Sequence, residues 1–160
     1  MKKLSTIVLR IALIGIALGV AAICFILLPL LWNEIPQSYP VYTFAVYTVF
    51  IALFAAAIPF FIGVYKAWRL LSFIDKGEAF SSASAKIVRA IAWCAAAISG
   101  IYIISLPFFY IWADNDDAPG LVLIGMMLAS VPFIVAVFAA LLQRLIREAA
   151  DLKSENELTV

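Results

Sequence analysis

Four long stretches of this sequence contain no charged residue. They cover residues 11–32, 41–65, 90–112 and 121–142, and none of them contains Asp, Glu, Lys or Arg. Each has about 20 residues or more, which at about 1.5 Å per residue of helix crosses a hydrocarbon layer about 30 Å thick. Backbone amides in lipid must form their hydrogen bonds within their own segment, so such stretches are predicted to be helices.

The composition of the whole chain supports a membrane location. Of the 160 residues, 66% are hydrophobic and 13% are charged, and the mean hydropathy is +1.11. A soluble domain is about half apolar and a quarter charged, and a water-soluble fold of this size lacks the interior to bury the excess. The sequence therefore predicts an all-α integral membrane protein with four transmembrane helices.

The predicted boundaries follow from the charges that flank each stretch. We expect one membrane domain, 1–160, with transmembrane helices at about 8–32, 41–66, 88–112 and 120–143, a loop at 67–87 and a tail at 144–160. The first stretch is too long for a cleaved secretory signal and is interpreted as a retained helix. Within the loop, the second helix is expected to continue to about Asp75, Gly77 to break it, and Ser81 or Ser82 to cap the third helix.

The orientation is predicted from the basic residues. All 11 Lys and Arg residues precede the first helix, lie between the second and third, or follow the fourth. The other two connections contain acidic residues instead, namely Glu34, Asp114, Asp116 and Asp117. The positive-inside rule then places the N-terminus, the middle loop and the C-terminus in the cytoplasm.

The two halves of the sequence resemble each other. The second helix contains Ile-Pro-Phe-Phe-Ile at 58–62, and the fourth contains Val-Pro-Phe-Ile-Val at 131–135. Arg-Leu-Leu at 69–71 and Arg-Leu-Ile at 144–146 follow them. This pattern predicts two tandem helical hairpins in the same orientation. Chance similarity between two apolar sequences is the alternative.

Small residues predict where helices approach each other closely. Gly15 and Gly19 form a GxxxG motif, and Ala92, Ala96 and Gly100 form a stripe of small residues in the third helix. Such residues let backbones come together in lipid. The contact lies either within one monomer or at the seam of a homodimer.

Several kinds of chemistry are excluded by missing residues. The sequence has no histidine, which removes His-based nucleophile activation, HExxH zinc sites and imidazole-bound haem. Cys24 and Cys94 have no CxxC partner and are interpreted as small hydrophobic residues. The acidic segment 114–117 does not fit a calcium loop. We therefore expect no enzymatic activity, no cofactor and no metal.

Residue content also limits which binding and transport functions the chain can have. A net charge of +1 and the lack of a basic stripe argue against direct binding of nucleic acid. A small transporter or export-linked protein is the alternative function, with a pore lined by Tyr47, Ser99, Tyr102 and Ser105. No ionisable side chain lies at mid-depth, however, where a coupled carrier normally needs one.

The candidate interaction sites lie on the predicted cytoplasmic side, in the middle loop and the tail. They are Gly77, Phe80, Ser81, Arg89, Glu155, Asn156, Leu158, Thr159 and Val160. The sequence therefore favours a non-enzymatic interaction or regulatory protein that presents these segments to a cytoplasmic partner.

The tail resembles a known family ending. Glu155-Asn156-Glu157-Leu158-Thr159-Val160 is similar to the ENDLTV-type ending of domain-of-unknown-function family 2975, which comprises small bacterial four-helix inner-membrane proteins. The segment Lys76-Gly77-Glu78-Ala79-Phe80-Ser81, followed by Arg89-Ala90-Ile91-Ala92, resembles the family's G-x-x-F-S…R-x-I-x block. The likeness covers essentially the whole chain. Ala85 stands near an expected asparagine, and Glu157 stands where aspartate is commoner.

The resemblance implies a location and a kind of partner. Family members are bacterial cytoplasmic-membrane proteins without an agreed activity, and their genes often neighbour a small helix-turn-helix regulator. A cytoplasmic regulator of that kind is therefore an expected partner, alongside the lipid bilayer.

Overall fold

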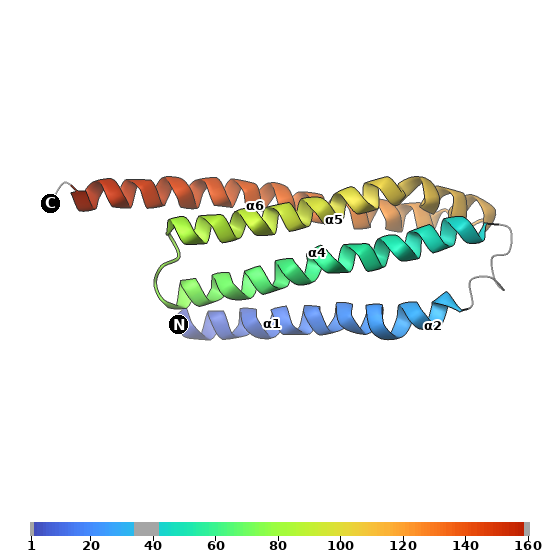
Figure 1. Ribbon diagram of the computed structural model, residues 1–160, viewed down its shortest axis with the longest axis horizontal. Helices are drawn as coiled ribbons and strands as arrows, with labels where there is room; N and C mark the ends of the chain where they lie inside the picture. Colours follow the sequence, from blue (N-terminus) through green and yellow to red (C-terminus); the bar gives the residue numbers. More distant parts are fainter. Residues whose placement is uncertain (1, 34–41, 159–160) are drawn as a thin grey trace.

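The four apolar stretches form four long helices. The computed structural model describes residues 2–33 and 42–158, with side chains described within 6–33 and 42–155. The elements are α1 (Lys2–Ala22), the π-helix η1 (Ile23–Leu27), α2 (Leu28–Trp32), α4 (Thr43–Asp75), α5 (Ser82–Asn115) and α6 (Gly120–Leu158). The first three follow one another without a break and form one rod (Figure 1).

The fold class predicted from the sequence is confirmed. The rod formed by α1, η1 and α2, and each of α4, α5 and α6, is long and apolar enough to cross a membrane. Large apolar side chains cover the outside of the bundle, and Phe25, Phe44 and Ile104 are each more than 70% exposed. Water would not tolerate such a surface, whereas lipid is as apolar as the side chains themselves. The chain is an all-α integral membrane protein with four spanning helices.

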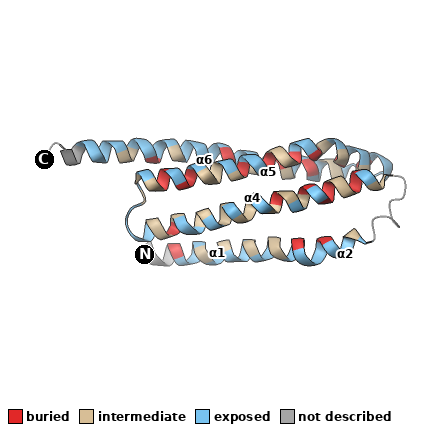
Figure 2. Ribbon diagram, viewed as in Figure 1, coloured by how far each residue is buried: buried red, intermediate tan, exposed pale blue. Residues whose placement is uncertain are grey.

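The helix α5 occupies the centre of the bundle. It packs closely on α6 along one side and on α4 along another, whereas α1 contacts mainly α4. Figure 1 shows these helices side by side in the order α1, α4, α5 and α6. Buried residues accordingly lie along α4 and α5, and few are found on α1 (Figure 2).

Small residues at regular spacing make the close packing of α5 and α6. The buried positions on α6 include Gly125, Ala129, Ala136, Ala139 and Ile146. Steps of three, four or seven residues keep such positions on one face of a helix, the pattern of left-handed helix pairs. Small side chains let the two backbones approach, which takes the place of a hydrophobic driving force in lipid.

The rod that contains α1 has a widened turn before its proline. The Leu28 backbone N–H donates to the carbonyl of Ile23, five residues back, and Pro29 follows at once. A proline ring in a regular α-helix clashes with the carbonyl four residues back and provides no N–H. The widened turn accommodates the ring without ending the helix.

The middle connection is short because both neighbouring helices extend toward it. As expected from the sequence, α4 ends at Asp75, Gly77 adopts a positive φ of 79°, and Ser81 caps α5. The connection is thus six residues, 76–81, inside the predicted loop 67–87. Where the membrane surfaces cut these helices stays a prediction.

The duplication of a hairpin also stays a prediction. The pair α5 and α6 packs tightly along most of its length, whereas α1 and α4 share far fewer contacts. The matching Pro-Phe segments lie in the interiors of α4 and α6, at Pro59 and Pro132. The structure therefore places the two motifs in corresponding helices without showing that the two hairpins are equivalent.

Candidate functional site

The predicted interaction residues of the middle loop form a compact turn. This turn lies at the end of the bundle that also carries the start of α1 and the last part of α6, which we call the basic end (Figure 1). The Ser81 hydroxyl accepts the backbone N–H of Ser84, and the Ser84 hydroxyl donates to the carbonyl of Glu78 at 2.9 Å. Phe80 projects from the turn with 63% of its surface exposed.

An ion pair ties α1 to α4 at the basic end. The Arg10 Nη2 atom lies 2.7 Å from the Asp75 Oδ2 atom and donates to the Ser72 hydroxyl at 3.4 Å. The guanidinium carbon also lies 5.2 Å from the centre of the Trp68 ring, within range of a cation–π contact. Because Arg10 and Asp75 are 65 positions apart, this contact fixes the first part of α1 against the end of α4.

The last part of α6 first packs on α5 and then continues past it. Ile146 is buried against Ala85 and Val88 near the start of α5. At 39 residues α6 is about 58 Å long, more than a bilayer core requires. Figure 1 shows that it runs beyond the connection between α4 and α5. The end of α6 therefore projects beyond the other helices (Figure 1).

Two exposed leucines share one face of the last part of α6. Leu145 and Leu152 are 62% and 65% exposed and are seven residues apart, so they share one helix face. Arg144 and Glu148 form a solvent-exposed ion pair at 3.2 Å beside them. The neighbouring Ile146 points the other way and is buried against α5.

The structure separates the two predicted interaction segments. The turn at 76–81 leads directly into the first residue of α5, whereas Glu155 is an exposed residue near the C-terminal end of α6. The backbone of Asn156 and Leu158 continues α6, and Thr159 and Val160 lie outside the described residues. Turn and tail share one end of the molecule, and the tail projects beyond the turn.

Arg89, the remaining predicted residue, lies elsewhere, in a groove between α5 and α6 beside Gln143. Lys86 and Arg147 line a continuation of the same groove and were not identified from the sequence. Their spacing contained a signal, because residues three or four apart share a helix face. Lys86 and Arg89 are three apart, and Gln143 and Arg147 are four apart.

The predicted helix-packing residues have different surroundings. A Cβ atom added at Gly15, Gly19 or Gly100 would meet nothing within 4 Å, so these glycines make no close approach to another helix within the described monomer. Ala92 packs beside the buried cluster formed by α5 and α6, and Ala96 is exposed on the surface of α5. A contact between two copies through Gly15 and Gly19 stays a prediction.

The hydroxyls of the predicted pore are used within the bundle. Ser99 donates to the carbonyl of Ala129 on α6 at 2.8 Å, and Ser105 donates to the carbonyl of Tyr102 at 2.9 Å. Tyr47 packs against Trp32, with ring centres 4.5 Å apart. The cavity of about 210 Å³ beside Tyr102 has an almost wholly apolar lining. These four side chains do not form a shared polar channel.

Cofactor and metal chemistry receive no support from the described residues. Cys24 is a buried free thiol, and Cys94 is a partly buried one. In the ranges 2–33 and 42–158, no group of three or more His, Cys, Asp or Glu side chains comes together to hold a metal ion. The acidic segment 114–117 forms the turn into α6, where Asp116 accepts a hydrogen bond from the Tyr42 hydroxyl at 3.2 Å.

The helices and their surface define a class, namely multi-pass α-helical membrane proteins. Within that class, the family described as protein of unknown function, DUF2975, matches residues 30–160, and the chain belongs to this family. The uncharacterized membrane protein YoaS of Bacillus subtilis (strain 168) is 44% identical over 160 residues, which cover 100% of both chains. No solved structure matches the chain. The resemblance seen in the tail and the middle loop is thereby confirmed.

Proposed function

We propose that this protein is a non-enzymatic membrane anchor that docks a cytoplasmic partner on the projecting end of α6. The observation that carries the proposal is the extension of α6 past the start of α5, with Leu152 65% exposed near its end and Leu145 exposed on the same helix face beside α5. In water an exposed leucine on a projecting helix is costly unless a partner covers it, and amphipathic helices commonly dock in this way.

The chemistry of the chain supports a role without catalysis. The sequence contains no histidine, and the hydroxyls of Ser99 and Ser105 are engaged in hydrogen bonds to backbone carbonyls. Nucleophile, base and metal arrangements need side chains that converge on one reacting atom. The described residues contain no such converging group of side chains. They do contain an exposed helix surface, at the end of α6, on which a partner can bind.

The distribution of basic residues supports a partner that binds on the cytoplasmic side of the membrane. All 11 basic residues of the sequence belong to segments at the basic end, which the positive-inside rule assigns to the cytoplasm. The inner membrane of a bacterium is the location that this orientation implies, with both termini in the cytoplasm. The family resemblance suggests a small helix-turn-helix regulator as the partner.

Site-specific photocrosslinking in intact cells tests the proposal. A photoreactive residue placed at Leu152 should capture the partner, and one at Leu123, which is 63% exposed at the opposite end of α6, should not. The Leu152→Ser substitution should weaken capture by a crosslinker at Lys153, while the unfolding midpoint of the bundle stays unchanged. The proposal is wrong if the intact protein and a variant truncated after Asp151 recover the same partners.

A further inference from the structure

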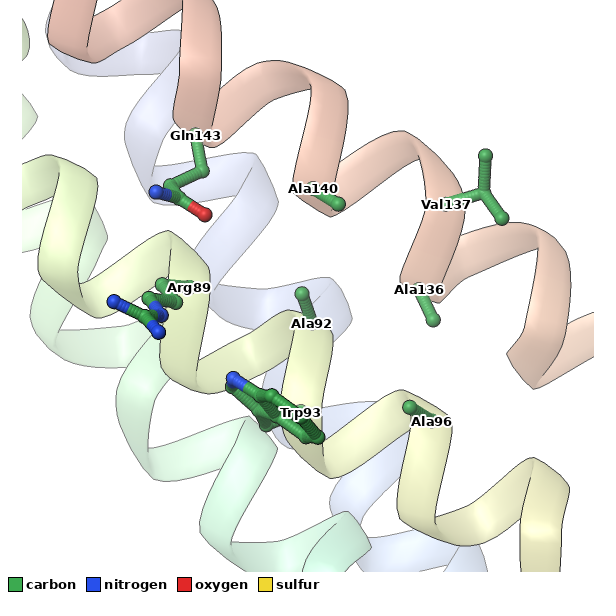
Figure 3. Close-up of a pocket in the computed structure, with 8 residues that line it drawn as sticks. All are labelled: Arg89, Ala92, Trp93, Ala96, Ala136, Val137, Ala140 and Gln143. Atoms are coloured by element: carbon green, nitrogen blue, oxygen red, sulfur yellow. The ribbon is translucent and has the colours of Figure 1, made fainter.

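An open groove runs between α5 and α6 on the outside of the bundle. Half of its lining residues are alanines, Ala92 and Ala96 from α5 and Ala136 and Ala140 from α6, and we call it the alanine groove. The groove has a volume of about 530 Å³. Figure 3 shows the alanine side chains along its length and Arg89 opposite Gln143 at one end.

The groove continues into a second, polar cavity at the basic end. This basic recess, of about 260 Å³, is lined by Ser82, Ala85, Lys86, Arg89, Gln143, Arg147, Ala150 and Asp151. Arg89 and Gln143 line both cavities, so the two form one continuous site. One part of the site is apolar and the other is polar, and the predicted span of α5, 88–112, puts the apolar part within the bilayer and the polar part at its surface.

The basic recess is strongly suited to an anion. Three cations, Lys86, Arg89 and Arg147, line the recess together with a single carboxylate, that of Asp151. None of the three cations has an ion-pair or hydrogen-bond partner within the described part of the chain. The recess also lies at the first turn of the 34-residue helix α5, where the helix dipole favours negative charge.

We propose that this site binds an anionic phospholipid of the cytoplasmic leaflet. The headgroup phosphate lies among Lys86, Arg89 and Arg147, and one acyl chain lies along the alanine groove. Basic pockets between transmembrane helices on the cytoplasmic side are suited to such headgroups. The inference is independent of the partner proposed for the end of α6.

The dimensions of the groove fit an acyl chain. From Arg89 to Ala96 the groove extends about 10 Å along α5, which is about two thirds of the hydrocarbon depth of one leaflet. Alanines leave a smooth channel where leucines would fill it. Trp93 lines the groove one turn from Arg89, and its indole is suited to the boundary between headgroups and chains.

A second copy of the chain is a less suitable occupant. A two-fold dimer across this face would bring the three cations of one copy close to the same three cations of its partner. Like charges at such a seam repel each other, and only Asp151 is available in the recess to offset them. An anionic lipid neutralises the recess instead.

Native mass spectrometry of the full chain tests the charge of the site. The protein is reconstituted in vesicles of equal parts phosphatidylglycerol and phosphatidylcholine, extracted in mild detergent, and its retained lipids are weighed. Wild type should retain phosphatidylglycerol in preference to phosphatidylcholine. The triple variant Lys86→Gln, Arg89→Gln and Arg147→Gln should lose this preference by up to about a hundredfold, since each basic residue near the surface contributes about a fivefold factor.

A matched variant separates this site from general attraction by charge. The triple variant Lys66→Gln, Arg69→Gln and Arg144→Gln removes the same net charge at the basic end without touching the recess. It should keep most of the preference for phosphatidylglycerol. Equal losses in the two triple variants would overturn the proposal, because diffuse attraction would then explain the binding.

A steric pair of variants tests the acyl chain. Ala96→Phe fills the alanine groove, whereas Ala97→Phe places the same ring on an exposed position outside it. Retention of phosphatidylglycerol should fall in the first variant and persist in the second. Retention that survives Ala96→Phe but is displaced by inorganic phosphate would show a bare anion site and overturn the proposal. So would a crosslinked dimer that Ala96→Phe abolishes while lipid retention persists.

Discussion

Replacing one glycine of α6 offers a sharp test of how α5 and α6 pack. A Cβ atom at Gly125 would lie 2.9 Å from Cγ and 3.1 Å from Cδ2 of Phe109, and 3.2 Å from Cδ2 of Leu106. Phe109 is only 3% exposed, and Cγ is the base of its ring rather than a flexible tip. The Gly125→Ala substitution therefore requires the ring, or the helix that carries it, to move.

The cost follows from the required displacement. Carbon atoms in contact lie about 3.5–4.0 Å apart, so the ring has to withdraw by about 0.6 Å or more. Overpacking of this kind costs about 1–3 kcal/mol. Alanine is favoured over glycine in a helix by up to about 1 kcal/mol, which offsets part of the loss. We expect a net destabilisation of up to about 2 kcal/mol.

A second glycine provides the matched control. A Cβ atom at Gly100 of α5 would meet nothing within 4 Å, so Gly100→Ala gains helix propensity without a clash. Because both variants make the same change in a helix, propensity cancels between them. The difference in free energy of unfolding should be the clash alone, about 1–3 kcal/mol.

The assay is reversible unfolding in mixed micelles of dodecyl maltoside and sodium dodecyl sulfate, followed by tryptophan fluorescence. In a Phe109→Ala background, which lacks the Cγ and ring atoms that the new methyl group would meet, Gly125→Ala should cost less than it does in the wild type. Equal stabilities for Gly125→Ala and Gly100→Ala would refute the reasoning. It would mean that α5 and α6 do not meet at these residues.

Three further perturbations test single contacts. Ser99→Ala should lower the free energy of unfolding by about 0.6 kcal/mol, and by no more than about 1.7, since it removes the hydrogen bond to the Ala129 carbonyl. A double-mutant cycle of Arg10→Gln and Asp75→Asn should give a coupling of up to about 1 kcal/mol that falls with added salt, because both side chains are about one third exposed. Ser81→Ala should cost about 1 kcal/mol and speed hydrogen exchange in the first turn of α5.

Matched variants show what each result means. Ser130→Ala removes a hydroxyl that bonds within its own helix, to Met127, and should change stability less than Ser99→Ala. Arg144→Gln breaks an exposed pair inside α6 and should leave the spacing of helices unchanged. Equal effects from the two serines, or no coupling between Arg10 and Asp75, would contradict the described contacts.

Features that depend on local sequence were predictable. A charge at the centre of a spanning helix costs about 2.5–3.5 kcal/mol, so stretches without charge define the helices before any packing is known. The turn between α4 and α5 was predictable for a similar reason. Gly77 accepts a positive φ, and the Ser81 hydroxyl satisfies a backbone N–H at the start of α5.

Features that depend on how helices face one another were not predictable. Lipid-facing and buried positions are equally apolar, so hydropathy leaves the rotation of each helix open. The ion pair of Arg10 with Asp75 spans 65 positions and becomes visible only once α1 lies beside α4. The basic recess was not predictable for the same reason, because Lys86 of α5 and Arg147 of α6 line one cavity only when α5 packs on α6.

Small-residue motifs show where a close approach is allowed, not where one occurs. Gly15 and Gly19 match the GxxxG pattern, but a Cβ atom added at either would meet no atom of another described helix within 4 Å. Gly125, in a less conspicuous stripe, makes the tightest contact because an aromatic side chain from α5 fills the space above it. Whether a glycine is used depends on the neighbouring helix, which the motif does not specify.

The rod of α1, η1 and α2 contacts α4 near both of its ends. At the basic end Arg10 of α1 pairs with Asp75, and toward the opposite end Cys24 of η1 and Leu28 of α2 pack against Phe50 of α4. Between these contacts lies an apolar cavity of about 250 Å³ bordered by α1, α4 and α5. Breaking the ion pair of Arg10 with Asp75 should therefore let the first part of α1 move away from α4, while α4, α5 and α6 stay packed on one another.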